Sequence, residues 1–180
     1  HIVGVQFRNC ATVGGSIWGR FGFSDVLTMF LALDTEVELF KGGRVCLWDF
    51  VKMPKDRDIL VHIIVKKTPI KTAYLSQRNT KTDFPVLACC VSLSEDGMKA
   101  VYGARPSKAF LLEDEENILK DAQTRSEEEK KAAYEKFADY AAKKVPTSGN
   151  MRGSAKYRTL LVKVLTRRAL EAVGGMSDEN

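Results

Sequence analysis

Histidine is nearly absent from this chain: its 180 residues include only His1 and His62. One is the first residue, and the other lies within a β-branched apolar stretch that predicts a strand. Catalytic triads and most zinc sites place a histidine beside other catalytic or ligating side chains. We therefore expect no triad and no zinc site, and we interpret His62 as a strand residue that bonds to its neighbours.

Cysteine is also scarce, and its spacing excludes several redox centres. The four cysteines, Cys10, Cys46, Cys89 and Cys90, form no C-x-x-C pair. Iron–sulfur clusters and zinc sites are usually held by closely spaced groups of cysteines. The sequence therefore predicts four buried free thiols and no cluster on this chain.

No apolar run reaches the roughly 18 residues that a membrane-spanning helix needs, and the first residues do not resemble a signal peptide. The composition, with 44% hydrophobic and 28% charged residues, is that of a folded globular domain. We expect a cytoplasmic protein that contacts no membrane. The net charge of +5 is modest and interleaved with acidic residues, so solvated helix faces are a better interpretation than nucleic-acid binding.

The first third of the chain alternates between helical and strand patterns. Residues 24–33 carry apolar side chains three and four positions apart, which predicts an amphipathic helix. Residues 36–39 and 45–47 around Gly42-Gly43 predict a β-hairpin, and residues 58–65 predict a further strand. Pro69 ends this region, so we place a domain boundary there, between residues 1–69 and 70–175.

The remainder of the chain has strands first and helices afterwards. Residues 72–78, 84–94 and 98–104 predict three antiparallel strands, the last two joined by Asp96-Gly97. From about residue 107 the pattern becomes helical, with one helix that begins at a Ser126–Glu129 capping box and another over residues 154–172. The last helix is expected to bury Tyr157, Leu160, Leu161, Val164 and Leu165. This order predicts an α+β fold.

The segment Arg8-Asn9-Cys10-Ala11-Thr12-Val13-Gly14-Gly15-Ser16 holds the clearest chemical signal. Adjacent glycines expose backbone N–H groups without a Cβ, so that a diphosphate can approach closely. The hydroxyls of Thr12 and Ser16 add further hydrogen-bond donors. A helix that begins near Ser24 would direct further N–H groups to the same place. A Gly-Gly pair alone is also typical of a plain turn, and the segment is neither a Walker loop nor a dinucleotide fingerprint.

The order of residues in this segment resembles the second flavin-binding motif of the FAD subunits of molybdenum hydroxylases, R-N-x-A-T-[IV]-G-G-[NS] followed by S-D-[LV]. Two further family patterns follow in order: [DE]-I-L at Asp58-Ile59-Leu60 and R-N-T-x-T-D-F-P-[VL]-L from Arg78 to Leu87. The region from Arg152 to Leu170 is similar to the family's C-terminal domain. The resemblance covers roughly residues 2–172.

The resemblance implies the second lobe of an FAD-binding domain, followed by a flavoprotein C-terminal domain with a three-stranded antiparallel sheet packed on helices. In this family FAD lies between two lobes, each of which supplies one diphosphate loop. Only the second loop is found here, so we expect the amino-terminal lobe to be absent and FAD binding to be weak. The implied cofactor-binding residues are Thr12, Val13, Gly14, Gly15, Ser16, Ser24, Asp25 and Leu60.

The resemblance also implies an electron-transfer role. Asp25 would bond toward the ribose or adenine, and Leu60 would pack on the isoalloxazine ring. Electrons would come from a molybdenum-cofactor subunit through an iron–sulfur subunit and leave to an acceptor, often a nicotinamide nucleotide. Exposed apolar residues around Ile17, Trp18 and Leu60 would favour self-association of this chain.

A different class of function remains open at the sequence level. The last helix carries a basic stripe of Lys156, Lys163, Arg167 and Arg168. Such a stripe could serve a non-enzymatic module that binds nucleic acid or docks a protein partner. Aromatic residues interleaved with the cations would favour nucleic acid, but Tyr157 is the only aromatic residue in this helix.

Overall fold

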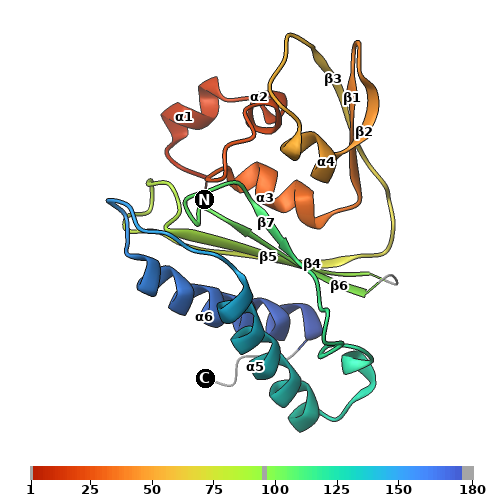
Figure 1. The fold of residues 1–180 in the computed structure, drawn as a ribbon, viewed down its shortest axis with the longest axis vertical. Helices are drawn as coiled ribbons and strands as arrows, with labels where there is room; N and C mark the ends of the chain where they lie inside the picture. The colour runs from red at the N-terminus through yellow and green to blue at the C-terminus, as the bar shows by residue number, and fades with distance from the viewer. Residues whose placement is uncertain (1, 95–96, 176–180) are drawn as a thin grey trace.

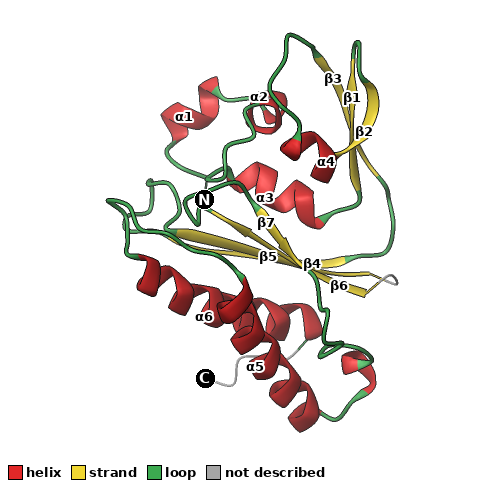
Figure 2. Ribbon diagram, in the orientation of Figure 1, coloured by secondary structure: helices red, strands yellow, loops and turns green. Residues whose placement is uncertain are grey.

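The computed structural model describes residues 2–94 and 97–175 (Figure 1; Figure 2). The helices are α1 (Val5–Cys10), α2 (Val13–Trp18), α3 (Asp25–Ala32), α4 (Leu47–Lys52), α5 (Glu127–Lys144) and α6 (Ala155–Gly174), with a short 3₁₀ helix at Ala122–Thr124. The strands are β1 (Thr35–Leu39), β2 (Gly43–Cys46), β3 (Leu60–Val65), β4 (Lys71–Gln77), β5 (Leu87–Ser94), β6 (Gly97–Gly103) and β7 (Phe110–Leu112). None of the described helices is long and apolar enough to cross a membrane.

The strands form two antiparallel sheets, which confirms the α+β prediction. One sheet has the order β2-β1-β3 and the other the order β4-β5-β6-β7. The predicted hairpin around Gly42-Gly43 is present, and Gly43 adopts a positive φ of 67°. At the second hairpin Ser94 pairs with Gly97, whereas Asp96 of the predicted turn lies outside the described residues.

Three details of the sequence-based prediction are wrong. Residues 84–86 precede β5 instead of belonging to it, and Leu47 begins α4 instead of extending the hairpin. Residues 110–112 form β7, which adds a fourth strand to the three predicted for the second sheet, so the helical region does not begin near residue 107. Three residues are too few for a period to show, and β7 depends on pairing with β6.

Local capping explains where the long helices begin. The hydroxyl of Ser24 accepts from Leu27 N, and Ser154 accepts from Tyr157 N. Ser126 forms the predicted capping box with Glu129. Gly175, in the left-handed region at φ 78°, ends α6.

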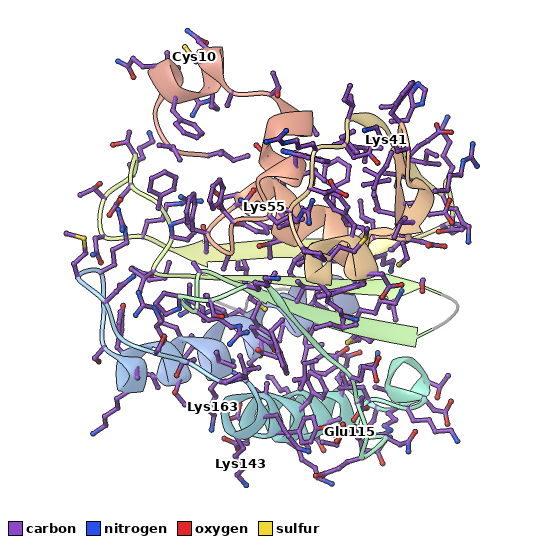
Figure 3. All side chains as sticks on the ribbon, turned by 45° about the horizontal axis from the view of Figure 1, so that its top comes forward. Cys10, Lys41, Lys55, Glu115, Lys143 and Lys163 are labelled. Atoms are coloured by element: carbon purple, nitrogen blue, oxygen red, sulfur yellow. The ribbon has the colours of Figure 1, made fainter. Side chains whose placement is uncertain are left out.

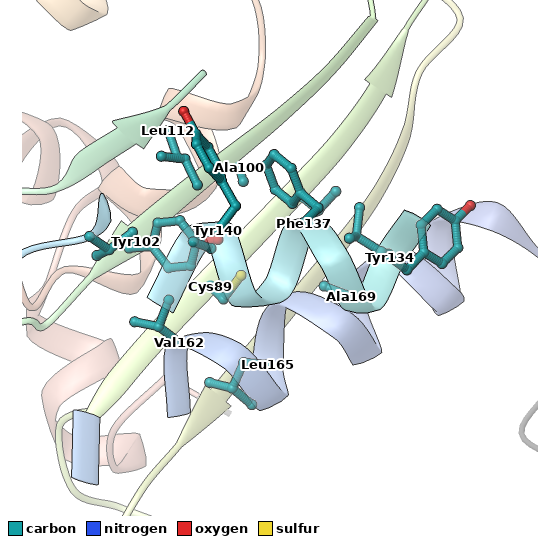
Figure 4. Close-up of a cluster of buried hydrophobic side chains, with 14 of the residues drawn as sticks. Cys89, Ala100, Tyr102, Leu112, Tyr134, Phe137, Tyr140, Val162, Leu165 and Ala169 are labelled. Atoms are coloured by element: carbon teal, nitrogen blue, oxygen red, sulfur yellow. The ribbon is translucent and has the colours of Figure 1, made fainter. Parts of the chain in front are cut away.

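Helices α5 and α6 pack on one face of the second sheet, and α3 packs on the other (Figure 1). The alternation of side chains along β5 and β6 divides the core accordingly. Cys89 and Tyr102 join the cluster under α5 and α6 that Figure 4 shows. Cys90 and Val101 join the cluster with α3 and the first sheet. The prediction of buried thiols is confirmed for the two adjacent cysteines, which lie on opposite faces of the sheet. It is wrong for Cys10 and Cys46, which are exposed because neither lies in a core element.

The segment 20–23 joins the N-terminal region closely to the second sheet. Ala104 N donates to Gly22 O at 2.6 Å. A Cβ atom on Gly22 would lie 1.7 Å from Ser107 O. Only glycine allows this approach of two backbones, which fixes the segment before α3 against the loop that follows β6.

Candidate cofactor-binding site

The glycine pair lies in the first turn of α2. Thr12 caps this helix, and its Oγ1 accepts from Gly15 N at 2.9 Å. Ser16 Oγ donates to Thr12 O at 3.0 Å. Apart from its two chain neighbours and the backbone of α2, no atom of residues 2–94 and 97–175 lies within 4 Å of the position that a Cβ on Gly14 would take, so the space beside this glycine is open.

A cavity of about 360 Å³ lies between α1, the start of α2 and the start of α3. Five of the eight residues expected from the sequence line it: Thr12, Gly15, Ser16, Ser24 and Asp25. Residues from α1 and the loop before α3 complete the wall, together with Phe84 from the connection between β4 and β5. The structure therefore brings together three segments of the family motifs: residues 8–16, the Ser24-Asp25 pair, and Phe84 of the motif from Arg78 to Leu87.

Val13, Gly14 and Leu60 are not among the residues that line the cavity. Val13 is 50% exposed on α2, next to Gly14. Leu60 lies half-buried in β3, where it pairs with Leu39 and packs on the N-terminal core. Ile17 is fully buried, so the expectation of exposed apolar surface at Ile17 is wrong; α2 turns this side chain into the core.

Aromatic rings form one side of the cavity, and no local pattern predicts that they come together. Phe23 lies 5.2 Å from Phe21 in a stacked arrangement and 4.7 Å from Phe84, measured between ring centroids. Phe7 of α1 contacts Phe84 edge-on at 6.0 Å. Phe7, Phe21 and Phe23 are each more than 40% exposed. Such a wall suits a planar ligand group.

Asp25 is the most deeply buried polar residue of the cavity. Its Oδ1 accepts hydrogen bonds from the Tyr74 hydroxyl and from the Arg78 guanidinium. The side chains of Asp25 and Arg78 are only 2% and 9% exposed. Burial, together with the Asp25 carboxylate, raises the pKa of Tyr74 far above its ordinary value, so the phenol stays a donor. These three residues lie in separate segments of the sequence, so no local pattern connects them, although Arg78 belongs to the motif from Arg78 to Leu87.

The basic stripe of α6 lies at the opposite end of the molecule from α1, as the positions of Lys163 and Cys10 show (Figure 3). Lys163 Nζ lies 2.9 Å from Glu135 and 2.6 Å from Asp139. Arg167 pairs with Glu135 and Glu171. Carboxylates thus balance the middle of the stripe, which weakens its attraction for phosphate groups.

Two families match the chain in succession. Residues 1–68 match the family described as "FAD binding domain in molybdopterin dehydrogenase". Residues 72–173 match the "CO dehydrogenase flavoprotein C-terminal domain".

Two curated proteins are similar in sequence. The "Uncharacterized protein YgfM" of Escherichia coli K12 is 32% identical over 110 residues, which cover 61% of this chain and 42% of that protein. The "Glyceraldehyde dehydrogenase medium chain" of Sulfolobus acidocaldarius is 27% identical over 187 residues, which cover 94% of this chain and 63% of that protein. The chain thus spans less than two thirds of the length of these relatives.

Two solved structures share the fold. A chain of carbon monoxide dehydrogenase from Hydrogenophaga pseudoflava superimposes with a TM-score of 0.75 at 21% identity, over 97% of this chain and 64% of that one. A chain of quinoline 2-oxidoreductase from Pseudomonas putida 86 gives a TM-score of 0.78 at 18% identity, over 98% and 65%.

Proposed function

We propose, starting from the fact that the chain belongs to the FAD-binding flavoprotein subunits of the molybdenum hydroxylases, that the cavity beside α2 holds the diphosphate end of FAD. One observation carries the proposal: Gly15 in the first turn of α2 and Ser24 and Asp25 at the start of α3 line the same cavity. These features lie ten residues apart in the sequence and meet only in the fold. Two helix starts and small residues around one cavity suit an anion that must approach the backbone closely.

The chain's own residues would position the cofactor and shield it from water. Thr12 holds the first turn of α2 through its bond to Gly15 N, and Ser16 places a hydroxyl at the cavity wall. Asp25 faces the cavity from a fixed orientation, so it could accept a hydrogen bond from a ribose hydroxyl or an adenine amine. The phenylalanine wall would cover a flat ring. FAD, when bound, supplies the electron chemistry.

Val13, Gly14 and Leu60 extend the proposed site beyond the cavity. Val13 and Gly14 belong to the first turn of α2, whose N–H groups have no partner within the helix. Leu60 would contact the ring system at a distance from the diphosphate. Because a cavity of about 360 Å³ is at the lower end of the range for ligand pockets, we assign it only part of the cofactor.

The proposed role in the whole protein is that of an oxidoreductase component. Electrons would pass from a molybdenum-cofactor subunit to a subunit that carries iron–sulfur clusters, and from there to FAD. They would leave FAD to an acceptor such as a nicotinamide nucleotide. This proposal rests on family membership and on the names of the related enzymes, among them a glyceraldehyde dehydrogenase medium chain. Residues 1–69 would form the FAD-binding part and residues 70–175 the C-terminal domain.

Replacement of Gly15 by valine tests the site. A Cβ on Gly15 would lie 3.0 Å from Thr12 Oγ1, so the added side chain disturbs the cap and fills space beside the diphosphate. We expect FAD affinity, measured by flavin fluorescence titration, to fall about tenfold or more, which corresponds to roughly 1.4 kcal/mol.

Gly149→Val is the matched control, because a Cβ on Gly149 meets its neighbours only at ordinary distances of 3.6 Å and more. This control should bind FAD like the wild type. Equal affinities for Gly15→Val and Gly149→Val, with both proteins folded, would refute the assignment of the loop.

A further inference from the structure

The carboxylate of Asp25 is held by two side chains that come from the second sheet and its first connection. Tyr74 lies in β4, and Arg78 directly follows that strand. The Tyr74 hydroxyl and the Arg78 guanidinium both donate hydrogen bonds to Oδ1 of Asp25. Because Asp25 and Arg78 are almost completely buried, the carboxylate cannot turn without breaking hydrogen bonds that water would not replace.

The two donors are themselves fixed in place. Tyr74 pairs with Cys90 of β5, and its side chain packs against the N-terminal core cluster. Arg78 NH1 also donates to Asp83 O at 2.7 Å. The network therefore joins the start of α3 to the second sheet through interior contacts of this chain, and it does not depend on whether any outer surface is free.

Within residues 2–94 and 97–175, the recorded hydrogen bonds of the Asp25 carboxylate all end on Oδ1. In the same part of the chain, Arg20 Nε is the one fully buried side-chain nitrogen or oxygen without a hydrogen-bond partner. Oδ2 of Asp25 is therefore not sealed in the core, and Asp25 lines the cavity assigned to the cofactor. Since an ionised carboxylate only accepts hydrogen bonds, Oδ2 suits a hydroxyl or an amine of the ligand rather than its diphosphate.

We infer that Tyr74 and Arg78 are positioning residues for the cofactor: they hold Oδ1 of Asp25 so that Oδ2 accepts a hydrogen bond from the AMP half of FAD. This inference rests on the proposed function of the cavity and adds a source of specificity to it. FMN carries the flavin ring and a phosphate but lacks the ribose hydroxyls and the adenine amine of FAD. An acceptor that is already fixed loses little freedom when its ligand binds, so Tyr74 and Arg78 favour FAD over FMN without contacting either.

Equilibrium dialysis with FAD and, separately, with FMN tests the inference. Tyr74→Phe keeps the ring and removes the donor, so FAD affinity should fall about threefold to tenfold, while FMN affinity should not change. A merely structural role of Tyr74 would lower both affinities. Tyr102→Phe is the matched control: it removes a buried tyrosine hydroxyl that bonds to Thr166 of α6, and it should bind both flavins like the wild type.

A double variant shows whether Tyr74 acts through Asp25. Both partners of Asp25 are donors, so in Asp25→Asn the amide oxygen should face them, and the amide nitrogen, which is a donor, should replace Oδ2. FAD affinity of Asp25→Asn should fall about tenfold. Adding Tyr74→Phe to Asp25→Asn should cause no further loss, because the two residues act as one unit.

The carboxyl carbon signal of Asp25 in the isotope-labelled wild type gives a measurement that needs no variant. This signal should shift when FAD is added and stay in place when FMN is added. Equal losses of FAD and FMN affinity in Tyr74→Phe, additive losses in the double variant, or equal shifts of the Asp25 signal with both flavins would overturn the inference. Loss of FAD affinity in Gly15→Val without any loss in Tyr74→Phe would overturn the positioning role alone, whereas equal affinities of Gly15→Val and Gly149→Val would overturn the proposed function itself.

Discussion

Loss of Arg78 should destabilise the fold far more than loss of an exposed arginine. Arg78 pairs with the buried Asp25 at the start of α3, and its NH1 also donates to Asp83 O at 2.7 Å. In Arg78→Met the Tyr74 hydroxyl is the one side-chain partner that the described residues leave to the Asp25 carboxylate. Breaking a buried pair leaves an uncompensated charge, which costs about 3–5 kcal/mol. We therefore expect the free energy of unfolding to fall by about that amount.

Urea unfolding followed by tryptophan fluorescence measures this change, since Trp18 and Trp48 both lie in the N-terminal region. Arg152→Met is the control: the Arg152–Asp83 pair is 29% and 26% exposed, and its loss should cost about 1 kcal/mol or less.

The double variant Asp25→Asn, Arg78→Met removes both charges of the buried pair. It should be more stable than Arg78→Met alone, because no charge is left buried without a partner. Equal losses for Arg78→Met and Arg152→Met, or a double variant no more stable than Arg78→Met, would refute this reasoning.

Two further predictions concern packing and capping. Gly22→Ala should lower the free energy of unfolding by about 3 kcal/mol, because its Cβ would lie 1.7 Å from Ser107 O. Gly14→Ala, with open space around the new atom, should change it by about 0.5 kcal/mol or less. Thermal melts compare the two variants, and similar losses of stability would contradict the prediction. Ser126→Ala should cost about 1 kcal/mol at neutral pH. Bonds from Ser126 lower the pKa of Glu129, so this contribution is present above the unfolded pKa and is lost as the pH falls through the folded one. The cost of Ser126→Ala should therefore shrink in acid, and a cost that is the same at neutral and acid pH would count against the capping box.

The parts of the fold that could be predicted from the sequence are those that short-range chemistry decides. Serine caps fixed the starts of the three longest helices, and the Gly42-Gly43 turn fixed the first hairpin. Period-two patterning located β1, and a β-branched apolar stretch located β3, each to within a few residues. Each of these signals lies within a few positions of the element that it determines.

The buried face of α6 could not be predicted, because a buried arginine decides it. Hydrophobicity alone placed Tyr157 and Leu160 in the core, but they are 38% and 56% exposed. The structure instead buries Arg158 completely, with its guanidinium donating to carbonyl groups that include Val86 O and Ser148 O at 2.8 Å. These partners lie up to 72 residues away, so no local pattern reveals that the charge is satisfied.

The candidate site also has a part that the sequence could predict and a part that it could not. The glycine loop could be found from its motif, whereas the pairing of Asp25 with Tyr74 and Arg78 joins residues about 50 positions apart. The aromatic wall likewise collects Phe7, Phe23 and Phe84 from three separate segments. Such groupings are consequences of how α3 packs on the second sheet.

The most direct test of the account is an NMR titration of the isotope-labelled chain with FAD, which detects weak binding as well as strong. The account predicts that the amide signals of Thr12, Gly14, Gly15 and Ser16 shift with FAD concentration, while those of α5 and α6 do not. Shifts confined to α6, or no shifts near the glycine pair at high FAD concentration, would contradict the claim that this cavity holds the diphosphate of FAD.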